Sequence, residues 1–263
     1  MTNFLTVDGA RLEYIQIAGD AAKPTLVFLH EGLGSIAMWR DFPQTVAQAT
    51  GCPVMVYSRR GYGQSDPLPG PRDVRYMHHE AQVVLPQVLA QLDITRPVLI
   101  GHSDGGSIAL LYAGHHAGPV AGVVAIASHV FVEDLTVTSI AQAREAFLTT
   151  DLGQRMGRYH RDAAHTFWGW NDIWLLPAFK HWNIEEVVPA IDVPILVIQG
   201  HDDEYGTKAQ CDSIARHATA PCEVLMLDQC RHSPHRDQPA ATSAAIGRFV
   251  AGLTRTKSPS SRL

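Results

Sequence analysis

The 263-residue sequence has little of what marks membrane, nucleic-acid-binding or secreted proteins. Its longest apolar run, residues 119–127, is far shorter than the ~20 residues that cross a bilayer. The net charge of −5 opposes attraction to nucleic acid or anionic lipid. The first sixteen residues lack the basic segment and apolar core of a secretory signal. We therefore expect a cytoplasmic protein without a nucleic-acid or membrane partner.

Cysteine is scarce, and no pair of cysteines has CxxC spacing; the four are Cys52, Cys211, Cys222 and Cys230. This pattern is typical of reduced cytoplasmic thiols, with an oxidised pair as the alternative. No set of residues has metal-ligand spacing, and "GLGS" is too short for the GxGxxG loop that binds dinucleotides. We expect no metal and no cofactor.

Short apolar runs recur along the chain and alternate with helical patterns. They are nearly continuous, as in strands buried on both faces of a parallel sheet. A hairpin around Asp8 and Gly9 precedes them. The pattern predicts an α/β fold, a mostly parallel central sheet with helices on both faces. Expected strands lie at 25–30, 52–58, 97–102, 122–128, 193–200 and 222–228, and expected helices at 38–49, 75–92, 107–116, 207–217 and 241–253.

One segment, residues 129–191, interrupts this alternation with helical and aromatic sequence only. A structureless loop of about sixty residues would be unusual inside a domain. We therefore expect a core domain formed by residues 1–128 and 192–263, with residues 129–191 as an inserted helical unit.

The segment "GHSDG" joins an apolar strand to a helical run and suggests a nucleophile at Ser103. In a tight strand–turn–helix corner, the central residue adopts a strained conformation and projects its side chain. Gly101 and Gly105 leave room for neighbouring backbone. The following helix begins at the serine, so that free N–H groups face any developing negative charge.

A serine hydroxyl needs a base, and the base needs an orienting acid. Asp202 and Asp203 follow the strand that ends at Gly200, and His232 and His235 follow the last strand. The order serine, acid, histidine is that of α/β-hydrolases.

With these motifs, the sequence resembles the α/β-hydrolase family from its first hairpin to its last helix. The family's Gly-x-x-Asp spacing implies Asp203 as the acid, with Asp202 as the alternative. Its histidine loop implies His232, although Arg231 replaces the usual glycine; His235 would then lead the terminal helix. Serine at the corner sets this chain apart from the dehalogenases and epoxide hydrolases of the family, which use aspartate. The insertion at 129–191 would form a helical cap.

The resemblance also implies an oxyanion hole, with the amide of Asp104 as one donor. The second donor would be Gly32 by direct alignment, or Leu33 if Glu31 is an inserted residue. Glu31 stands where the family often has glycine. We expect its carboxylate to pair with Arg59 or Arg60, or alternatively to face the substrate pocket.

Aromatic residues crowd the insertion and suggest an apolar or aromatic pocket. Candidate pocket residues are Glu31, His129, Trp168 and Trp170, although most of the aromatics are expected to pack the cap onto the core.

Together these residues predict a serine hydrolase of a small-molecule ester that works without a cofactor. Thioester, lactone and carbon–carbon bond hydrolysis are alternatives on the same triad. A non-catalytic small-molecule receptor is an alternative of another class. The sequence does not predict the oligomeric state.

Overall fold

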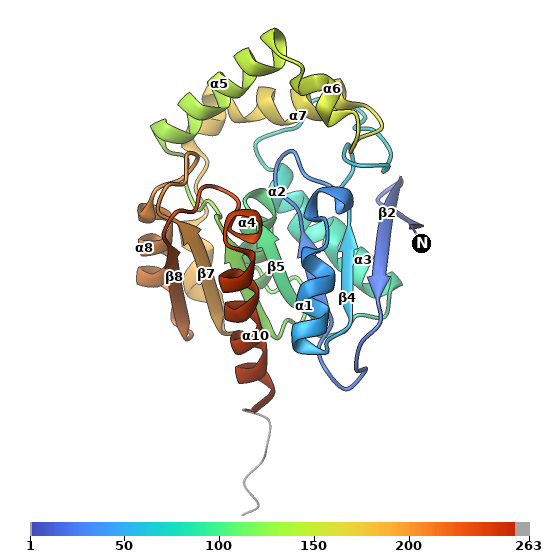
Figure 1. The fold of residues 1–263 in the computed structure, drawn as a ribbon, viewed down its shortest axis with the longest axis vertical. Coiled ribbons are helices and arrows are strands. Elements are labelled where there is room, and N and C mark those ends of the chain that lie inside the picture. The colour runs from blue at the N-terminus through green and yellow to red at the C-terminus, as the bar shows by residue number, and fades with distance from the viewer. Residues whose placement is uncertain (1, 256–263) are drawn as a thin grey trace, which may run out of the picture.

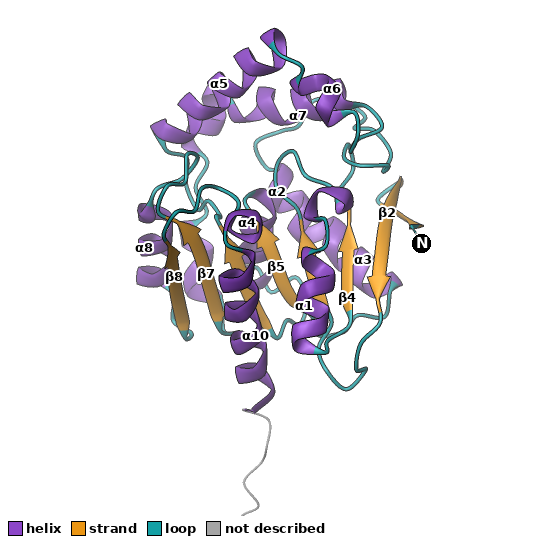
Figure 2. Ribbon diagram, in the orientation of Figure 1, coloured by secondary structure: helices purple, strands orange, loops and turns teal. Residues whose placement is uncertain are grey.

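The computed structural model describes residues 2–255, whose eight strands form one sheet with helices on both faces (Figures 1 and 2). The order is β1-β2-β4-β3-β5-β6-β7-β8, and only the β1–β2 and β2–β4 pairs are antiparallel. The mostly parallel sheet is confirmed, and β3 to β8 lie within the predicted runs. The strands are β1 (Asn3–Val7), β2 (Ala10–Ile17), β3 (Leu26–Leu29), β4 (Val54–Tyr57), β5 (Val98–His102), β6 (Gly122–Ile126), β7 (Ile195–Gly200) and β8 (Cys222–Leu227).

The parallel strands are buried on both faces, which explains their unbroken apolar sequence. Along β6, Val123 and Ala125 contribute to one core, and Val124 and Ile126 to the other. Two helices, α1 (Phe42–Thr50) and α10 (Pro239–Arg255), cover the core that contains Val124 and Ile126. The short turn η1 (Ile36–Trp39) precedes α1. The opposite face carries α2 (Tyr76–His79), the π-helical turn η2 (Glu80–Val84), α3 (Leu85–Gln91), α4 (Asp104–Gly114) and α8 (Lys208–His217).

The residues between β6 and β7 are helical, as the sequence predicted. Three helices, α5 to α7, stand over the carboxyl ends of the parallel strands (Figure 1). The turn η4 instead packs against α4 and α8, beside the sheet. The bounds are α5 (Asp134–Thr149), α6 (Leu152–Met156), α7 (Ala163–Trp174), η3 (Pro177–His181) and η4 (Glu185–Ala190), and α9 (Pro234–Asp237) precedes α10.

No helix between residues 2 and 255 is both long enough and apolar enough to cross a bilayer.

Helix α4 and turn η4 approach closely at Gly114, where an added Cβ would overlap the carbonyl oxygen of Val187. We expect Gly114→Ala to lower the free energy of unfolding by about 1–3 kcal/mol, because the two backbones must separate. Gly247→Ala is the matched control, since a Cβ there meets nothing within 4 Å. This change in the interior of α10 should stabilise by up to ~1 kcal/mol. Urea denaturation measures the free energy of unfolding of both variants. Equal changes in the two variants would contradict tight packing at Gly114.

Candidate active site

Ser103 lies at a sharp corner between β5 and α4. Its backbone has φ 52° and ψ −118°, a conformation that residues with side chains seldom adopt. A Cβ at Gly101 would overlap the carbonyl of Gly105, and a Cβ at Gly105 would overlap the carbonyl of Leu29. Only glycine allows these approaches, and together they hold Ser103 at the carboxyl edge of the sheet.

Three side chains from separate loops form a hydrogen-bonded series at this corner. The Oγ atom of Ser103 is 3.0 Å from Nε2 of His232, in the loop after β8. The Nδ1 atom of His232 is 2.9 and 3.0 Å from the two carboxylate oxygens of Asp203, in the loop after β7. Strands of a parallel sheet end at the same edge, so residues distant in sequence meet there.

Neighbouring groups hold Asp203 and His232 in place through further hydrogen bonds. Backbone amides of Tyr205 and Gly206 donate to Asp203 at 2.8 and 3.2 Å. The amide of His232 donates to the carboxylate of Glu204 at 3.1 Å. The imidazole is therefore held with Nε2 directed at Ser103.

Charges and hydrogen bonds together have a larger effect than burial on the pKa values of His232 and Asp203. Burial alone would lower the pKa of His232, but the charge and hydrogen bond of Asp203, with the charges of Glu204 and Glu31, raise that pKa above its usual value. Burial alone would raise the pKa of Asp203, but His232 and the Tyr205 amide lower it. The arrangement favours a basic imidazole beside an ionised carboxylate.

The two alternative residues lie elsewhere. Asp202 is exposed. The ring of His235 packs on Trp39 and Phe42, at centroid distances of 4.7 and 5.6 Å. Burial lowers the pKa of His235 to about 3, so its ring is neutral. The structure therefore places Asp203 and His232, not Asp202 or His235, beside Ser103.

The expected pairing of Glu31 with an arginine is wrong. Its carboxylate lies 3.3 Å from Nδ1 of His102, while Arg59 bonds the backbone carbonyl of Glu31. The other ring nitrogen of His102 lies 2.7 Å from the carbonyl oxygen of His232. Both ring nitrogens of His102 thus face an oxygen atom. The pair supports the loop that carries His232.

Arg59 and Asp104 form a second buried charged pair beneath the corner. Arg59 is fully buried and lies 3.7 Å from the carboxylate of Asp104, the residue after Ser103. The same carboxylate accepts a hydrogen bond of 2.7 Å from the hydroxyl of Tyr76. The guanidinium also donates to the carbonyl of His30. These bonds join the corner to the loop after β3.

Both candidate oxyanion donors of the loop after β3 have free amides. Within residues 2–255, neither the Gly32 nor the Leu33 N–H donates to a protein acceptor. The indole of Trp170 lies against Gly32, where a Cβ would overlap it. The carbonyl of Leu33 accepts from His160 at 2.9 Å.

The candidate pocket residues divide into two groups. The ring of His129 lies 6.0 Å from that of His232 and 5.3 Å from that of Trp174. Trp168 and Trp170 lie on opposite faces of α7, because two residues along a helix turn a side chain by about 200°. The ring of Trp168 packs on Phe147 and under Arg144.

Several residues that surround the triad were not found from the sequence. The ring of Tyr205 lies 4.8 Å from that of His232. Gln199, on β7, donates to Asp203 at 3.3 Å. Tyr205 follows the end of β7, so the sequence places it near the carboxyl edge of the sheet. Its contact with the ring of His232 is seen only in the structure.

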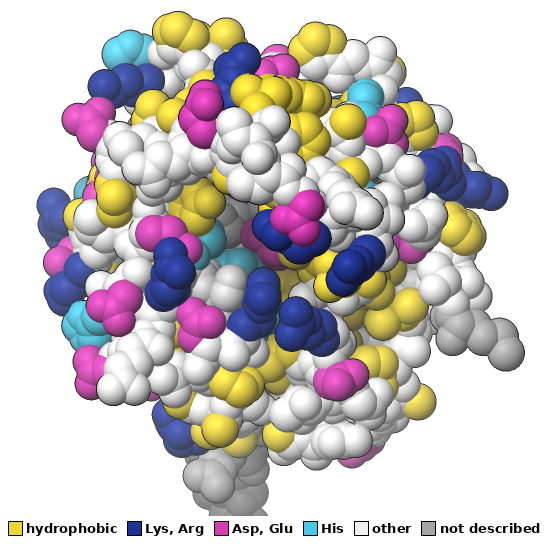
Figure 3. All heavy atoms as spheres, turned by 45° about the horizontal axis from the view of Figure 1, so that its top comes forward, with side chains coloured by type: hydrophobic (Ala, Val, Ile, Leu, Met, Phe, Trp, Pro, Cys, Tyr) yellow, Lys and Arg dark blue, Asp and Glu magenta, His cyan; other side chains and the backbone are white. Residues whose placement is uncertain are grey.

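Helices α5 to α7 stand over this edge of the sheet, and Figure 3 shows a hollow on that side with histidine and acidic side chains at its floor. Ser103 itself is 7% exposed. Across the described part of the chain, no three His, Cys, Asp or Glu side chains are grouped to hold a metal ion.

Helix α5 of the cap is bonded to the loop that carries the acid. The hydroxyl of Thr136 donates to the carbonyl of Tyr205 at 2.5 Å. The hydroxyl of Ser139 donates to the carbonyl of Glu204, also at 2.5 Å. The positions of helix α5 and of Asp203 therefore both depend on the loop at Glu204 and Tyr205.

We expect Glu31→Gln to lower the free energy of unfolding at pH 7 by about 1–2 kcal/mol, because it weakens a charge-assisted hydrogen bond. Burial alone would raise the pKa of Glu31, but His102 lowers it far below its usual value. Such a carboxylate stabilises above the usual glutamate pKa of about 4.3 and loses this effect as the pH falls further.

Urea denaturation against pH measures this difference. It should be largest near neutrality and shrink below about pH 4. Glu223→Gln, at an exposed position of β8, is the control and should leave stability unchanged. A constant difference at all pH values would contradict the ionic pairing.

Two curated relatives resemble the chain over different lengths. The sn-1-specific diacylglycerol lipase ABHD11 of Mus musculus is 36% identical over 104 residues, which are 39% of this chain and 32% of that protein. The match thus spans about a third of that relative. The 2-succinyl-6-hydroxy-2,4-cyclohexadiene-1-carboxylate synthase of Enterobacter sp. (strain 638) is 25% identical over 258 residues, 89% of this chain and 94% of that protein.

A solved structure, the enol-lactonase from Burkholderia xenovorans LB400, shares the fold. It has a TM-score of 0.75 at 21% identity and covers 95% of this chain and 100% of its own. The sequence profile described as "alpha/beta hydrolase fold" matches residues 24–167, more than half of the chain. The resemblance expected from the sequence motifs is confirmed, and the chain belongs to the alpha/beta hydrolase fold family.

Proposed function

We propose that the protein is a serine hydrolase that cleaves the carboxylic-ester-type bond of a small molecule through an acyl-enzyme. The carrying observation is the hydrogen-bonded series from Ser103 through His232 to Asp203. It has the geometry by which a base activates a serine hydroxyl while an acid orients the base.

In this mechanism, Oγ of Ser103 attacks the carbonyl carbon while Nε2 of His232 takes its proton. Asp203 keeps the other proton on Nδ1. The tetrahedral oxyanion accepts hydrogen bonds from the amide of Asp104 and from Gly32 or Leu33. The intermediate collapses by breaking the bond to the leaving group, which takes the proton from Nε2. Water then gives its proton to Nε2 and attacks the acyl carbon, and Ser103 leaves as the free hydroxyl.

The surroundings of the triad favour an apolar or aromatic acyl group. The rings of His129 and Tyr205 lie beside that of His232, Trp174 packs against His129, and the indole of Trp170 lies against Gly32 in the loop after β3. The lipase and the lactonase among the similar proteins are both named for ester-type bonds. These two names support ester hydrolysis, while thioester and carbon–carbon bond cleavage stay alternatives because they use the same three residues.

Ser103→Ala and His232→Gln should each reduce ester hydrolysis by at least about 10³-fold, because each removes a reacting group. His235→Gln is the matched control for His232 and should retain most of the activity, since His235 packs against Trp39 and Phe42. The assay is steady-state hydrolysis of p-nitrophenyl acetate, p-nitrophenyl butyrate and phenyl benzoate, with an acyl-CoA and a vinylogous diketone as competing bond classes.

A fluorophosphonate probe separates an enzyme from a non-catalytic receptor. It should label the wild-type protein at Ser103 and leave the Ser103→Ala variant unlabelled. Equal losses of hydrolysis in the two histidine variants, or labelling that survives Ser103→Ala, would contradict the proposed roles.

The pH profile of kcat/KM should rise with pH, because only neutral imidazole accepts the proton from serine. Its midpoint should lie above the ordinary histidine pKa of about 6.5, since the net effect on His232 is to raise its pKa. Asp203→Asn should move the midpoint down and lower the plateau. A profile that is flat between about pH 5 and about pH 9 would remove His232 as the base.

A further inference from the structure

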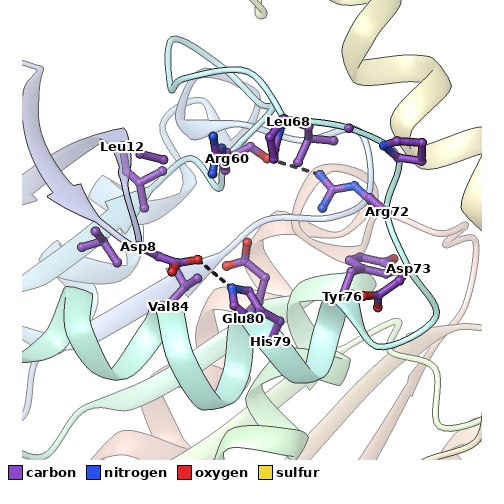
Figure 4. Close-up of a pocket in the computed structure, with 15 residues that line it drawn as sticks. Asp8, Leu12, Arg60, Leu68, Arg72, Asp73, Tyr76, His79, Glu80 and Val84 are labelled. Atoms are coloured by element: carbon purple, nitrogen blue, oxygen red, sulfur yellow. Dashed lines mark hydrogen bonds and ion pairs between the residues drawn. The ribbon is translucent and has the colours of Figure 1, made fainter.

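A second cavity lies outside the active site, between the β1–β2 hairpin, the loop at 60–73 and helix α2 with its π-turn (Figure 4). Its volume is about 290 Å³. None of Ser103, Asp203 and His232 lines it. Much of its wall is apolar and comprises Val7, Ala10, Leu12, Leu68 and Val84.

Glu80 supplies an unfilled hydrogen-bond acceptor to this cavity. The residue is 5% exposed, and its Oε2 atom has no hydrogen-bond partner. Figure 4 shows the carboxyl group rising from the helix into the space beneath Arg60 and Leu68. Glu80 also begins the π-helical turn η2, a distortion that is frequent at functional sites. Buried polar atoms normally have partners, so this one calls for a ligand group.

Arg72 supplies an unfilled donor to the same cavity. Its guanidinium lies over the rings of Tyr62 and Tyr76, at 4.9 and 5.1 Å, and one Nη donates to the carbonyl of Arg60 at 3.3 Å. Its Nε atom is buried without a partner. Among the described residues no ion pair joins Arg72 to Glu80. Burial raises the pKa of Glu80, and the charges of Arg59 and Arg72 oppose this without a direct ion pair to Arg72.

The other charged residues of the lining, Asp8, His79, Arg60 and Asp73, each have a partner. The Nε atom of Arg60 donates to the carbonyl of Pro67 at 2.9 Å, and the carboxylate of Asp73 accepts from the amide of Arg75 at 2.6 Å. Asp8 and His79 close one side of the cavity through a contact of 2.7 Å (Figure 4). The buried polar side-chain atoms of the lining that lack a partner are thus one acceptor, Oε2 of Glu80, and one donor, Nε of Arg72.

We propose that this cavity binds a small zwitterion with an apolar side chain, namely an α-amino acid. Its ammonium group donates to Glu80, its carboxylate accepts from Arg72, and its side chain packs against the apolar wall. A simple amine would leave Arg72 unpaired. A simple carboxylate would bring like charge toward Glu80. The site does not depend on the hydrolytic reaction, because it shares no residue with the triad.

Isothermal titration calorimetry of the full chain tests this with L-leucine and L-phenylalanine. The matched amines, 3-methylbutylamine and 2-phenylethylamine, lack the carboxylate, and the matched acids, 4-methylpentanoate and 3-phenylpropanoate, lack the ammonium group. At least one amino acid should bind saturably. Each matched analogue should bind about tenfold or more weakly, because one charge-assisted hydrogen bond is lost.

Two variants assign the two ends of the ligand. Glu80→Gln should weaken the amino acid and the amine about tenfold or more, but should not weaken the acid. Arg72→Gln should weaken the amino acid and the acid, but not the amine. Glu223→Gln, on β8, is the control and should bind like the wild type. Either variant suffices if the other does not fold, as thermal unfolding reports.

Absence of saturable binding for both amino acids at millimolar concentrations would overturn the proposal. So would amino-acid affinity that is unchanged in both folded variants, or analogues that bind as tightly as the amino acid. Each result is independent of hydrolysis, which is measured separately with Ser103→Ala.

Discussion

Backbone segments at the active site approach so closely that only a hydrogen atom fits between them. Gly105 meets the carbonyl of Leu29 at the end of β3. Gly200, at the end of β7, meets the carbonyl of Cys230 in the histidine loop, where the amide of Asp202 also donates at 2.9 Å. The distances within the triad depend on these contacts, because the three loops can meet only if their backbones do.

Buried charged side chains then hold the active-site loops in position through hydrogen bonds to their backbone carbonyls. Arg59 bonds the loop after β3 through the carbonyls of His30 and Glu31 and faces Asp104 beneath the nucleophile. The pair of Glu31 and His102 holds the carbonyl of His232. Arg59, Glu31 and His102 have no part in the proposed bond-breaking steps, yet their side chains fix the loops from which the reacting groups project. Such supporting bonds are typical of preorganised sites.

Local sequence patterns were sufficient for the sheet and for the corner at Ser103. Continuous apolar runs identify buried strands, and the glycines around Ser103 report a close approach within a few residues of the chain. The partner of Glu31 could not be predicted in this way, because His102 lies 71 residues away and the choice between it and an arginine depends on packing. The packing of Trp168 on Phe147 and Arg144 could not be predicted either, since composition does not say which face of α7 a side chain occupies.

The hydrogen bonds from α5 to the carbonyls of Glu204 and Tyr205 tie this helix to the loop that carries Asp203. The amide of Tyr205 that orients Asp203 belongs to the residue whose carbonyl binds Thr136 of the cap. The position of α5 and the orientation of the Asp203 carboxylate therefore depend on the same backbone segment. In the proposed reaction, binding energy from parts of a substrate that touch only the cap would appear in kcat as well as in KM.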